Sequence, residues 1–406
     1  MMPKIQELIN KGAIIPDPHN VLIGDEVDIG RLAGKGVALY PGTRIFGANT
    51  FISEGAQIGA EGPVTIENCH VGPQVELKGG FFTGAVFLRK AVCGLGSYVR
   101  QGTILEEEAS IAHTVGLKQT ILFPYVTLGS LINFCDCLMA GGTSRKNHSE
   151  VGSSYIHFNF TPNQDKATPS LMGDVPKGVM LNQSPIFLGG QGGLVGPCRL
   201  AFGTVVAAGT ICRNDQLEEN HLVFGTKTRS GSIPYSPGSF LGIKRIISNN
   251  IIYIGNLSAL RQWYLHVRSL FTGPEMSQEI LDGLHAAALN CIEERIRQLA
   301  HLSRKIGESE GSNGRQHEFV SLWPEVEDFL KRLASFEGSP KILQDFIQVI
   351  ENKIQIIGKA YLGVVKSLEL HESALGTQWL EGIVQQVVDG TAERLPFIGK
   401  SKSSFQ

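Results

Sequence analysis

The stretch LGGQGGLVGPCRLAFGTVVAAGT, residues 188–210, decides the fold, because an aliphatic residue returns in it at every sixth position. These residues are Leu188, Leu194, Leu200 and Val206, and Gly and Ala are frequent between them. A period of six is neither the 3.6 of an α-helix nor the 2 of a half-buried strand. The stretch is therefore part of an internal repeat.

The same spacing occurs earlier in the chain, in Ile23 and Ile29; Ile52, Ile58 and Val64; Val71 and Leu77; and Val115 and Ile121. A six-residue unit holds one short strand and one corner, and three units close a triangular coil of 18 residues with the aliphatic side chains inside. Gly at the corners lets the backbone turn where a Cβ would clash. The period predicts a mainly β fold, a parallel β-helix over residues 21–215 after an N-terminal cap at 1–20. Prisms of this kind are left-handed, a hand that the period itself does not encode.

Composition limits the class of partner and the compartment. The chain has 406 residues, with 36 Lys and Arg against 38 Asp and Glu, so its charge indicates neither nucleic acid nor an anionic membrane as a partner. Of 48 Gly, 35 precede residue 251, which places the repeat in the front part. The seven Cys contain no CxxC pair, and the first residues lack the pattern of a secretion signal. We therefore expect reduced thiols and a cytoplasmic protein.

Two polar stretches, 134–150 and 159–185, interrupt the period and are predicted to be loops projecting from the prism. Residues 216–242 are predicted to be a linker, because they include a cluster of Gly, Ser and Pro. From 243 to 395 the apolar period becomes helical, which predicts a bundle of about five helices before a tail at 396–406. The apolar stripes are Leu281, Leu284, Ala288, Ile292, Ile296 and Leu299, and Leu343, Phe346, Ile350, Ile354 and Ile357.

Two segments carry a resemblance to a known family. Residues 186–215, IFLGGQGGLVGPCRLAFGTVVAAGTICRND, preceded by VGSSYIHFNFTPNQDKATPSLMGD at 151–174, resemble the acetyltransferase half of the GlmU family. That family joins a glucosamine-1-phosphate N-acetyltransferase to a UDP-N-acetylglucosamine pyrophosphorylase. The resemblance implies a homotrimer of prisms in which acetyl-CoA lies between neighbouring prisms and the amino group of a sugar phosphate is acetylated.

The resemblance also assigns binding residues. Arg100, in VRQGTILEEE, and Lys118, in TVGLKQT, match the family's phosphate-binding cations. Independently of any family, their spacing of 18 stacks them on successive coils, where two cations repel unless an anion lies between them. The alternative is two solvated surface cations.

The resemblance extends to residues that the family uses to hold the sugar and the cofactor. Asn159 and Phe160 match an Asn-Tyr pair that holds the sugar, and Asn133 stands where the family has Tyr. Asn159 could equally be a residue that caps a loop. The resemblance implies cofactor contacts at Lys166, Ala207 and Arg213.

The expected acid and base are missing. Acetyl transfer to an ammonium group needs a base, and the family's catalytic His and acidic residue fall on Ser130 and Gly116. His148, His113 and His157 are the candidate replacements, and a structural role or plain exposure is the alternative for each. Cys135 and Cys137 form a CxC without a second ligand pair, so we predict no metal site.

Two classes of function remain open. The first is a transferase that moves an acetyl group from acetyl-CoA to an amino-sugar phosphate or nucleotide sugar. The second is a non-catalytic scaffold that binds a sugar phosphate, or a partner of a separate nucleotidyltransferase. Pyrophosphorylase activity is not predicted, because the chain begins directly with repeats and shows no nucleotidyltransferase domain.

Overall fold

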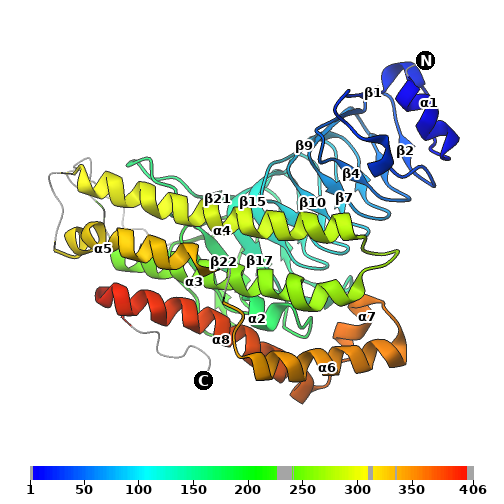
Figure 1. Ribbon diagram of the computed structural model, residues 1–406. Helices are drawn as coiled ribbons and strands as arrows, with labels where there is room; N and C mark the ends of the chain where they lie inside the picture. The colour runs from blue at the N-terminus through cyan, green and yellow to red at the C-terminus, as the bar shows by residue number, and fades with distance from the viewer. Residues whose placement is uncertain (1–2, 226–239, 241, 310–313, 334–335, 400–406) are drawn as a thin grey trace.

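The structure, a computed structural model, describes residues 3–225, 240, 242–309, 314–333 and 336–399. It is a parallel β-solenoid of about 11 turns followed by a region of several helices, which confirms the predicted fold class (Figure 1). The short helix α1, Pro3–Asn10, covers the first turn. Its Lys4 Nζ donates hydrogen bonds to the carbonyl oxygens of Gly24, Asp25 and Val27.

Two parallel sheets, one of ten strands and one of sixteen that continues around a corner, form the three sides of the prism, here called the first, second and third face. The first face contains β2 Ala38–Leu39, β5 Gln57–Ile58, β8 Glu76–Leu77, β11 Val92–Cys93, β14 Ser110–Ile111, β16 Thr127–Leu128, β20 Glu150–Val151, β23 Phe187–Leu188, β26 Val205–Val206 and β28 Leu222–Val223. The second face contains β1 Leu22–Ile23, β3 Arg44–Phe46, β6 Val64–Glu67, β9 Gly80–Thr83, β12 Ser97–Val99, β21 Ile156–Phe158, β24 Gly193–Val195 and β27 Ile211–Cys212. The third face contains β4 Phe51–Ile52, β7 His70–Val71, β10 Val86–Phe87, β13 Ile104–Leu105, β22 Ser170–Met172 and β25 Cys198–Leu200.

Two longer strands, β15 Gly116–Leu122 and β17 Asn133–Met139, run along the second face and turn onto the third. β15 pairs with β12 at one end and with β13 at the other. At the turn, Gln119 and Asp136 have φ of 49° and 61°, and Gly102 lies at the same corner with φ of 73°. This corner between the second and third faces positions the candidate site described below.

The inward aliphatic residues explain why the chain coils. All thirteen residues of the six-residue pattern are at most 6% exposed, so the predicted inward direction is confirmed. Burying each such side chain contributes roughly 1.5–3 kcal/mol relative to exposure. Because the inward residues stack from coil to coil, they form one continuous core along the prism.

The structure differs from the predicted loop at 134–150. Residues 133–139 form β17, since Phe134, Leu138 and Met139 point into the core despite the intervening Cys and Asp. Only the residues after β17 leave the prism, as a hairpin of β18 Gly142–Ser144 and β19 Asn147–His148. A short strand can keep its place in a stacked coil even where its sequence looks polar, because the neighbouring coils supply its hydrogen bonds.

The predicted loop at 159–185 and the predicted linker also differ in part. Within the loop, β22 returns to the third face and α2, Val175–Gly178, begins at the side-chain cap of Asp174. The first face extends to β28, so the solenoid continues into the segment predicted to be a linker. The remainder of that linker at 226–239 and 241, and the tail at 400–406, lie outside the described residues.

Six α-helices lie between residues 243 and 394 of the described chain. They are α3 Ile243–Gln262, α4 Gln278–Gly307, α5 Gly314–Lys331, α6 Pro340–Ile357, α7 Tyr361–Lys366 and α8 Leu370–Arg394. A π-helical turn, Trp263–Val267, and a 3-10 turn, Arg268–Phe271, extend α3, and a last 3-10 turn spans Pro396–Ile398. The apolar stripe of α4 is buried along its whole predicted length, whereas on α6 only Phe346 and Ile350 are fully buried.

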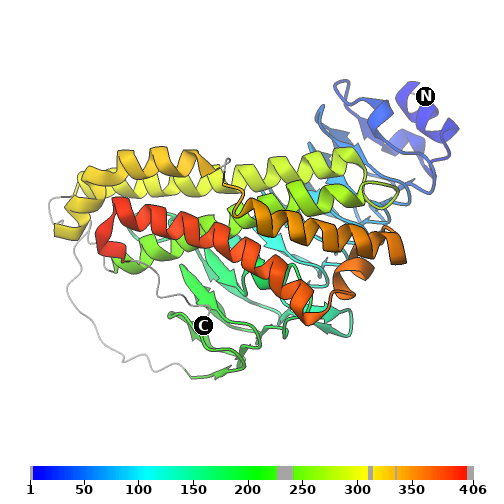
Figure 2. The same ribbon diagram turned by 60° about the horizontal axis from the view of Figure 1, so that its bottom comes forward.

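The helices cover the third face of the prism. α4 packs against β7 and β10, and α3 packs against β22 (Figure 1). Figure 2 shows the helices together on one side of the solenoid, with strands uncovered on the other. The helical bundle therefore lies beside the prism, along the corner at which β15 and β17 turn.

Candidate anion-binding site

Three cationic side chains gather at the edge of the second face that adjoins the helical bundle. Val99 pairs with Leu117, so Arg100 and Lys118 follow in register on neighbouring coils, about 4.8 Å apart. Lys118 in turn pairs with Cys135, and Lys166 lies near the same cysteine. This confirms the stacking predicted from the spacing of 18. We call Arg100, Lys118 and Lys166 the cation cluster.

The surroundings of the cation cluster favour an anion. Arg100 Nε is buried with no hydrogen-bond partner, and within the described part of the chain none of the three cations forms an ion pair with a carboxylate. Burial raises the pKa of the Cys135 thiol, and the three cations act in the opposite direction because they stabilise its thiolate. A phosphate group would neutralise such a cluster by charge-assisted hydrogen bonds.

Polar and aromatic groups predicted to bind a sugar flank the cluster. Asn133 is exposed on the second face and pairs with Gly116 and Ile156 of the adjacent coils. Asn159 directly follows β21, and its Nδ2 donates a hydrogen bond of 3.3 Å to Asp136 Oδ2. Phe160 is 59% exposed, so its ring is accessible for stacking. The structure thus brings Asn159 and Phe160 to the same edge as the cations, and places Asn133 on the same face, two residues before Cys135 on β17.

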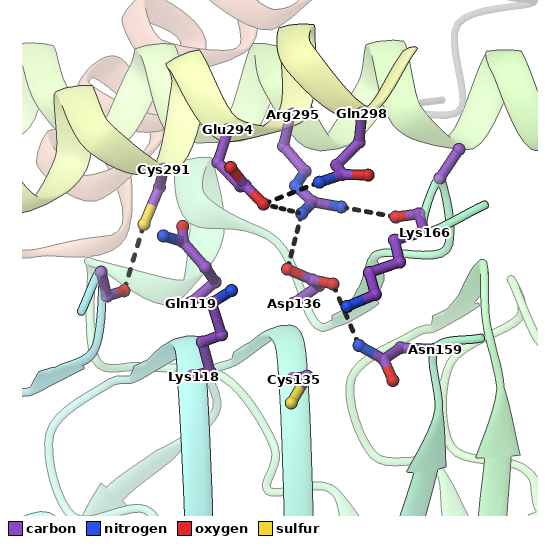
Figure 3. A network of polar contacts seen from close by, with 12 residues as sticks. Lys118, Gln119, Cys135, Asp136, Asn159, Lys166, Cys291, Glu294, Arg295 and Gln298 are labelled. Atoms are coloured by element: carbon purple, nitrogen blue, oxygen red, sulfur yellow. Dashed lines mark hydrogen bonds and ion pairs between the residues drawn. The ribbon is translucent and has the colours of Figure 1, made fainter. Parts of the chain in front are cut away.

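A buried ion pair connects this edge to α4 (Figure 3). Arg295 Nη2 lies 2.6 Å from Asp136 Oδ1, and Arg295 Nη1 donates a hydrogen bond of 3.1 Å to the carbonyl oxygen of Lys166. Arg295 is 1% and Asp136 5% exposed. Burial raises the pKa of Asp136, whereas Arg295 and Asn159 lower it by stabilising the carboxylate. Asp136 therefore contacts both Arg295 on α4 and Asn159 after β21.

Sequence reasoning missed both members of this pair. Asp136 lay in a stretch predicted to be a loop, and Arg295 is one of many charged residues on a long helix. One signal was available for Asp136, because it occupies the corner position one coil after Gln119. For Arg295 the helical period indicates only that it neighbours the apolar stripe.

None of the three candidate histidines has an accessible ring at the corner of the cation cluster. His157 is 3% exposed, and its ring nitrogens contact the Cys135 carbonyl oxygen at 2.6 Å and Ser170 Oγ at 2.7 Å. Burial lowers its pKa to about 4, so it is a neutral structural residue that a substrate cannot reach. His148 lies on the hairpin at another corner, where Arg145 is anchored to Tyr125, so within one chain it is remote from the cation cluster.

His113 is exposed at the corner between the first and second faces. Its Nδ1 lies 2.8 Å from Ser130 Oγ, the residue at the position where the resembled family has its catalytic His. The imidazole therefore occupies space next to that position, although it comes from the preceding coil. It also lines a groove on the first face together with Lys78 and Leu95.

The predicted cofactor residues other than Lys166 lie further along the prism. Arg213 is exposed in the same column as Arg100, five coils away, or about 24 Å. Ala207 follows β26 at the corner between the first and second faces. Arg213 and Ala207 therefore lie away from the cation cluster. Only an extended ligand would contact both them and the cluster.

Metal-binding and membrane-spanning features are both absent from the described residues. In that part of the chain, no group of three or more His, Cys, Asp and Glu side chains could hold a metal ion. Among the described helices, none is long and apolar enough to cross a membrane.

The fold and the cation cluster together define a hexapeptide-repeat β-solenoid protein with a cationic edge. No protein-family profile matches the chain. Its N-terminal part is homologous to proteins named bifunctional protein GlmU, in agreement with the resemblance seen in the sequence. The relative from Thermotoga maritima is 26% identical over 215 residues, which is 53% of this chain and 42% of that protein.

Other relatives give the same result. The GlmU proteins of Corynebacterium aurimucosum and Pelobacter propionicus are 25% and 27% identical over 226 and 211 residues, covering 56% and 52% of this chain and 41% and 40% of their own lengths. The chain thus spans less than half the length of the curated relatives it matches. The helical bundle lies outside the N-terminal part to which the homology applies.

Proposed function

We propose that this protein binds a sugar phosphate or nucleotide sugar at the cation cluster and transfers an acetyl group to it from acetyl-CoA. The observation that carries the proposal is the stacking of Arg100 on Lys118, with Lys166 beside them and no carboxylate paired to any of the three in the described chain. The homology to GlmU proteins supports the sugar-nucleotide class of ligand.

The reaction assigns His113 the role of base. The imidazole takes a proton from the sugar ammonium group, the free amine attacks the thioester carbonyl carbon, and the C–S bond breaks. The product is an amide, and the thiolate of CoA receives a proton. Ser130 contacts His113 Nδ1 and would hold the ring in one orientation. The groove beside His113 would hold part of acetyl-CoA.

A homotrimer would fit the exposed surface of the prism. The helical bundle covers the third face, which leaves the first and second faces, and the corner between them, for other chains. Leu131 at that corner is 55% and Leu95 43% exposed. We further propose a reducing compartment, the cytoplasm, because all seven cysteines are unpaired.

The test is release of free CoA thiol from acetyl-CoA in the presence of glucosamine 1-phosphate and a panel of related amino sugars. We expect turnover by the wild-type chain and loss of at least about 100-fold in rate for His113→Ala with unchanged sugar-phosphate affinity. Arg100→Ala with Lys118→Ala should weaken binding of glucosamine 1-phosphate by about 100-fold. Lys146→Ala, an exposed cation on the hairpin, is the matched control.

A second candidate function is binding without chemistry, either as a scaffold or as a partner of a separate nucleotidyltransferase. The observation that favours it is Ser130 and Gly116 at the positions expected for the catalytic pair. Calorimetry then shows binding of a sugar phosphate while no acceptor releases thiol. Absence of both binding and thiol release would contradict the two candidates together.

A further inference from the structure

The segment that carries Asn159 and Lys166 crosses from the second face to the third. β21 ends at Phe158 and β22 begins at Ser170, and the residues between them form a loop at the corner beside α4. Within this loop, Asp165 accepts a hydrogen bond from Thr161. We call residues 159–169 the bridging loop.

Side chains of the helical bundle donate hydrogen bonds to two consecutive carbonyl groups of the bridging loop. Arg295 on α4 donates to the carbonyl oxygen of Lys166 at 3.1 Å, and Asn250 Nδ2 on α3 donates to that of Ala167 at 2.8 Å. Shortly after the loop, Asn256 Oδ1 accepts a hydrogen bond of 2.8 Å from the backbone N–H of Val175. Three side chains of the bundle thus fix a segment that precedes them in sequence by more than 80 residues.

Arg295 also reaches the start of the loop through Asp136. Its second guanidinium nitrogen binds Asp136 Oδ1, and Asp136 Oδ2 accepts from Asn159 Nδ2. Figure 3 shows Arg295 pointing from α4 into the gap between Asp136 and Lys166, with Lys118 and Cys135 on the strands below. The planar guanidinium contacts the two groups through two different nitrogens held in a fixed geometry, which the single nitrogen of a lysine ammonium does not reproduce.

Neighbouring residues on α4 hold Arg295 in place. Glu294 lies 3.9 Å from its guanidinium, and Gln298 Nε2 donates to Glu294 Oε1 at 2.9 Å. Arg297 pairs with the same Glu294 at 2.7 Å but is 63% exposed and makes no hydrogen bond to the bridging loop in the described structure. The two arginines therefore share Glu294 as a partner and differ in burial and in the contact with the loop and Asp136.

We infer that the helical bundle is a part of the ligand site, and that Arg295 is a positioning residue that sets the places of Asn159 and Lys166 beside Arg100 and Lys118. This inference rests on the proposed function for the identity of the ligand. It assigns a role to the half of the chain that lies outside the homology to GlmU proteins. One side of the site is then formed by the second face of the prism and the other by the helical bundle of the same chain.

The first measurement needs no ligand. Hydrogen exchange of the backbone amides of residues 159–169 is compared in the full-length wild type, Arg295→Lys and Arg297→Lys. We expect exchange to be at least about tenfold faster in Arg295→Lys, because the two guanidinium nitrogens that join Asp136 to the carbonyl oxygen of Lys166 are lost. Arg297→Lys should match the wild type. Equal exchange rates in all three proteins would overturn the inference.

A second variant tests the same inference without leaving an unpaired buried charge that could prevent folding. Removing one member of a buried ion pair leaves an uncompensated charge, whereas removing both does not. The double variant Asp136→Asn with Arg295→Met removes both charges of the pair, and Asn is well suited to the φ of 61° at position 136. It should fold, as shown by an unchanged circular dichroism spectrum, and still show fast exchange in the bridging loop.

The second measurement uses a ligand and Cys135. Cys135 is half-buried while the other six cysteines are buried, so it is the preferred target of iodoacetamide. Its rate of alkylation in increasing glucosamine 1-phosphate, with inorganic phosphate as the simpler probe, reports occupation of the site. We expect the double variant to need about tenfold more ligand for the same protection, as for loss of one charge-assisted hydrogen bond.

The outcomes separate the two proposals. If the wild type shows no protection by either probe, the proposed ligand class is wrong, while the exchange data still decide whether Arg295 positions the loop. If the wild type is protected and the double variant is protected equally well, positioning by Arg295 is wrong and its role is only to stabilise the fold. A purely structural role would lower the unfolding temperature without changing the protection curve.

Discussion

Gly80 shows how closely the coils of the solenoid stack. It begins β9 with φ of 140°, and a Cβ at this position would lie 2.1 Å from the carbonyl oxygen of Ser97 on the next coil. Its own N–H donates to the carbonyl oxygen of Pro63 on the preceding coil. The excess of Gly in the front part of the chain thus has two causes, backbone angles at some corners and close approach of neighbouring coils at others.

We predict that Gly80→Ala is strongly destabilising, because the backbone of two coils must separate to admit the methyl group. The free energy of unfolding should fall by about 3 kcal/mol or more. Gly209→Ala is the control, since Gly209 has φ of 74° but no atom lies within 4 Å of the position that its Cβ would take. Its cost should be about 1 kcal/mol. Denaturant titration measures both, and equal losses would contradict the close-approach argument.

At the scale of elements, the contact between the prism and the turns that follow α3 contains an unbalanced set of charges. Glu106 and Glu107 are both buried and, among the described residues, Glu106 has one neighbouring cation, Arg268, which pairs with Glu107 and lies 3.6 Å from the ring centre of Tyr361. Tyr264 donates a hydrogen bond of 2.5 Å to Glu106. Burial first, and then the charge of Glu107, raises the pKa of Glu106 to about 7, although Arg268 opposes the shift.

This gives a pH dependence of defined sign. The folded-state pKa lies above the ordinary value of 4.5, so between these values the folded protein retains a proton that the unfolded chain has lost. The contribution of Glu106 to stability therefore falls as pH rises from about 4.5 to about 7 and does not return above it. The loss is at most on the order of 3 kcal/mol.

We predict that Glu106→Gln removes this dependence, because the amide is neutral at every pH and its oxygen still accepts from Tyr264. The variant should unfold at a higher temperature than the wild type at pH 8 and at about the same temperature at pH 5. Glu54→Gln, at an exposed pair with Lys35, is the control and should follow the wild type at both pH values. A Glu106→Gln variant that is less stable at pH 8 would show that the carboxylate is charged in the folded protein.

At the scale of the whole molecule, the bundle restricts how chains can assemble. With the third face covered, a threefold assembly would place the corner between the first and second faces near its axis, which brings Leu131 of each chain together. His113 and Ser130 occupy the same corner. Catalysis by His113 would then occur next to a contact between chains.

We predict a particle of three 44.0 kDa chains in sedimentation equilibrium, and dissociation when Leu131 is replaced by Glu, because three carboxylates would meet near the axis. Leu370→Glu places the same charge on a side chain that is 86% exposed on the bundle and should leave the mass unchanged. A wild-type chain that sediments as a monomer would rule out the assembly.

The period of six in the sequence by itself determined the solenoid, the inward residues and the stacking of Arg100 on Lys118, because coil geometry places residues 18 apart at neighbouring positions on successive coils. The helical period likewise determined the bundle and the buried stripe of α4. These features depend on residues close to one another in the repeat. They could be predicted without knowing any packing between distant segments.

Only the tertiary structure decided which faces remain open and what completes the site. The covering of the third face, the burial of His157, the contact of His113 with Ser130, and the bridge from Arg295 to Asp136 and Lys166 all join segments that are separated in sequence. Side-chain contacts across such separations leave no period in the sequence. A buried Arg on a long helix has the same local pattern as an exposed one, and its partner becomes known only when the helix is placed against the prism.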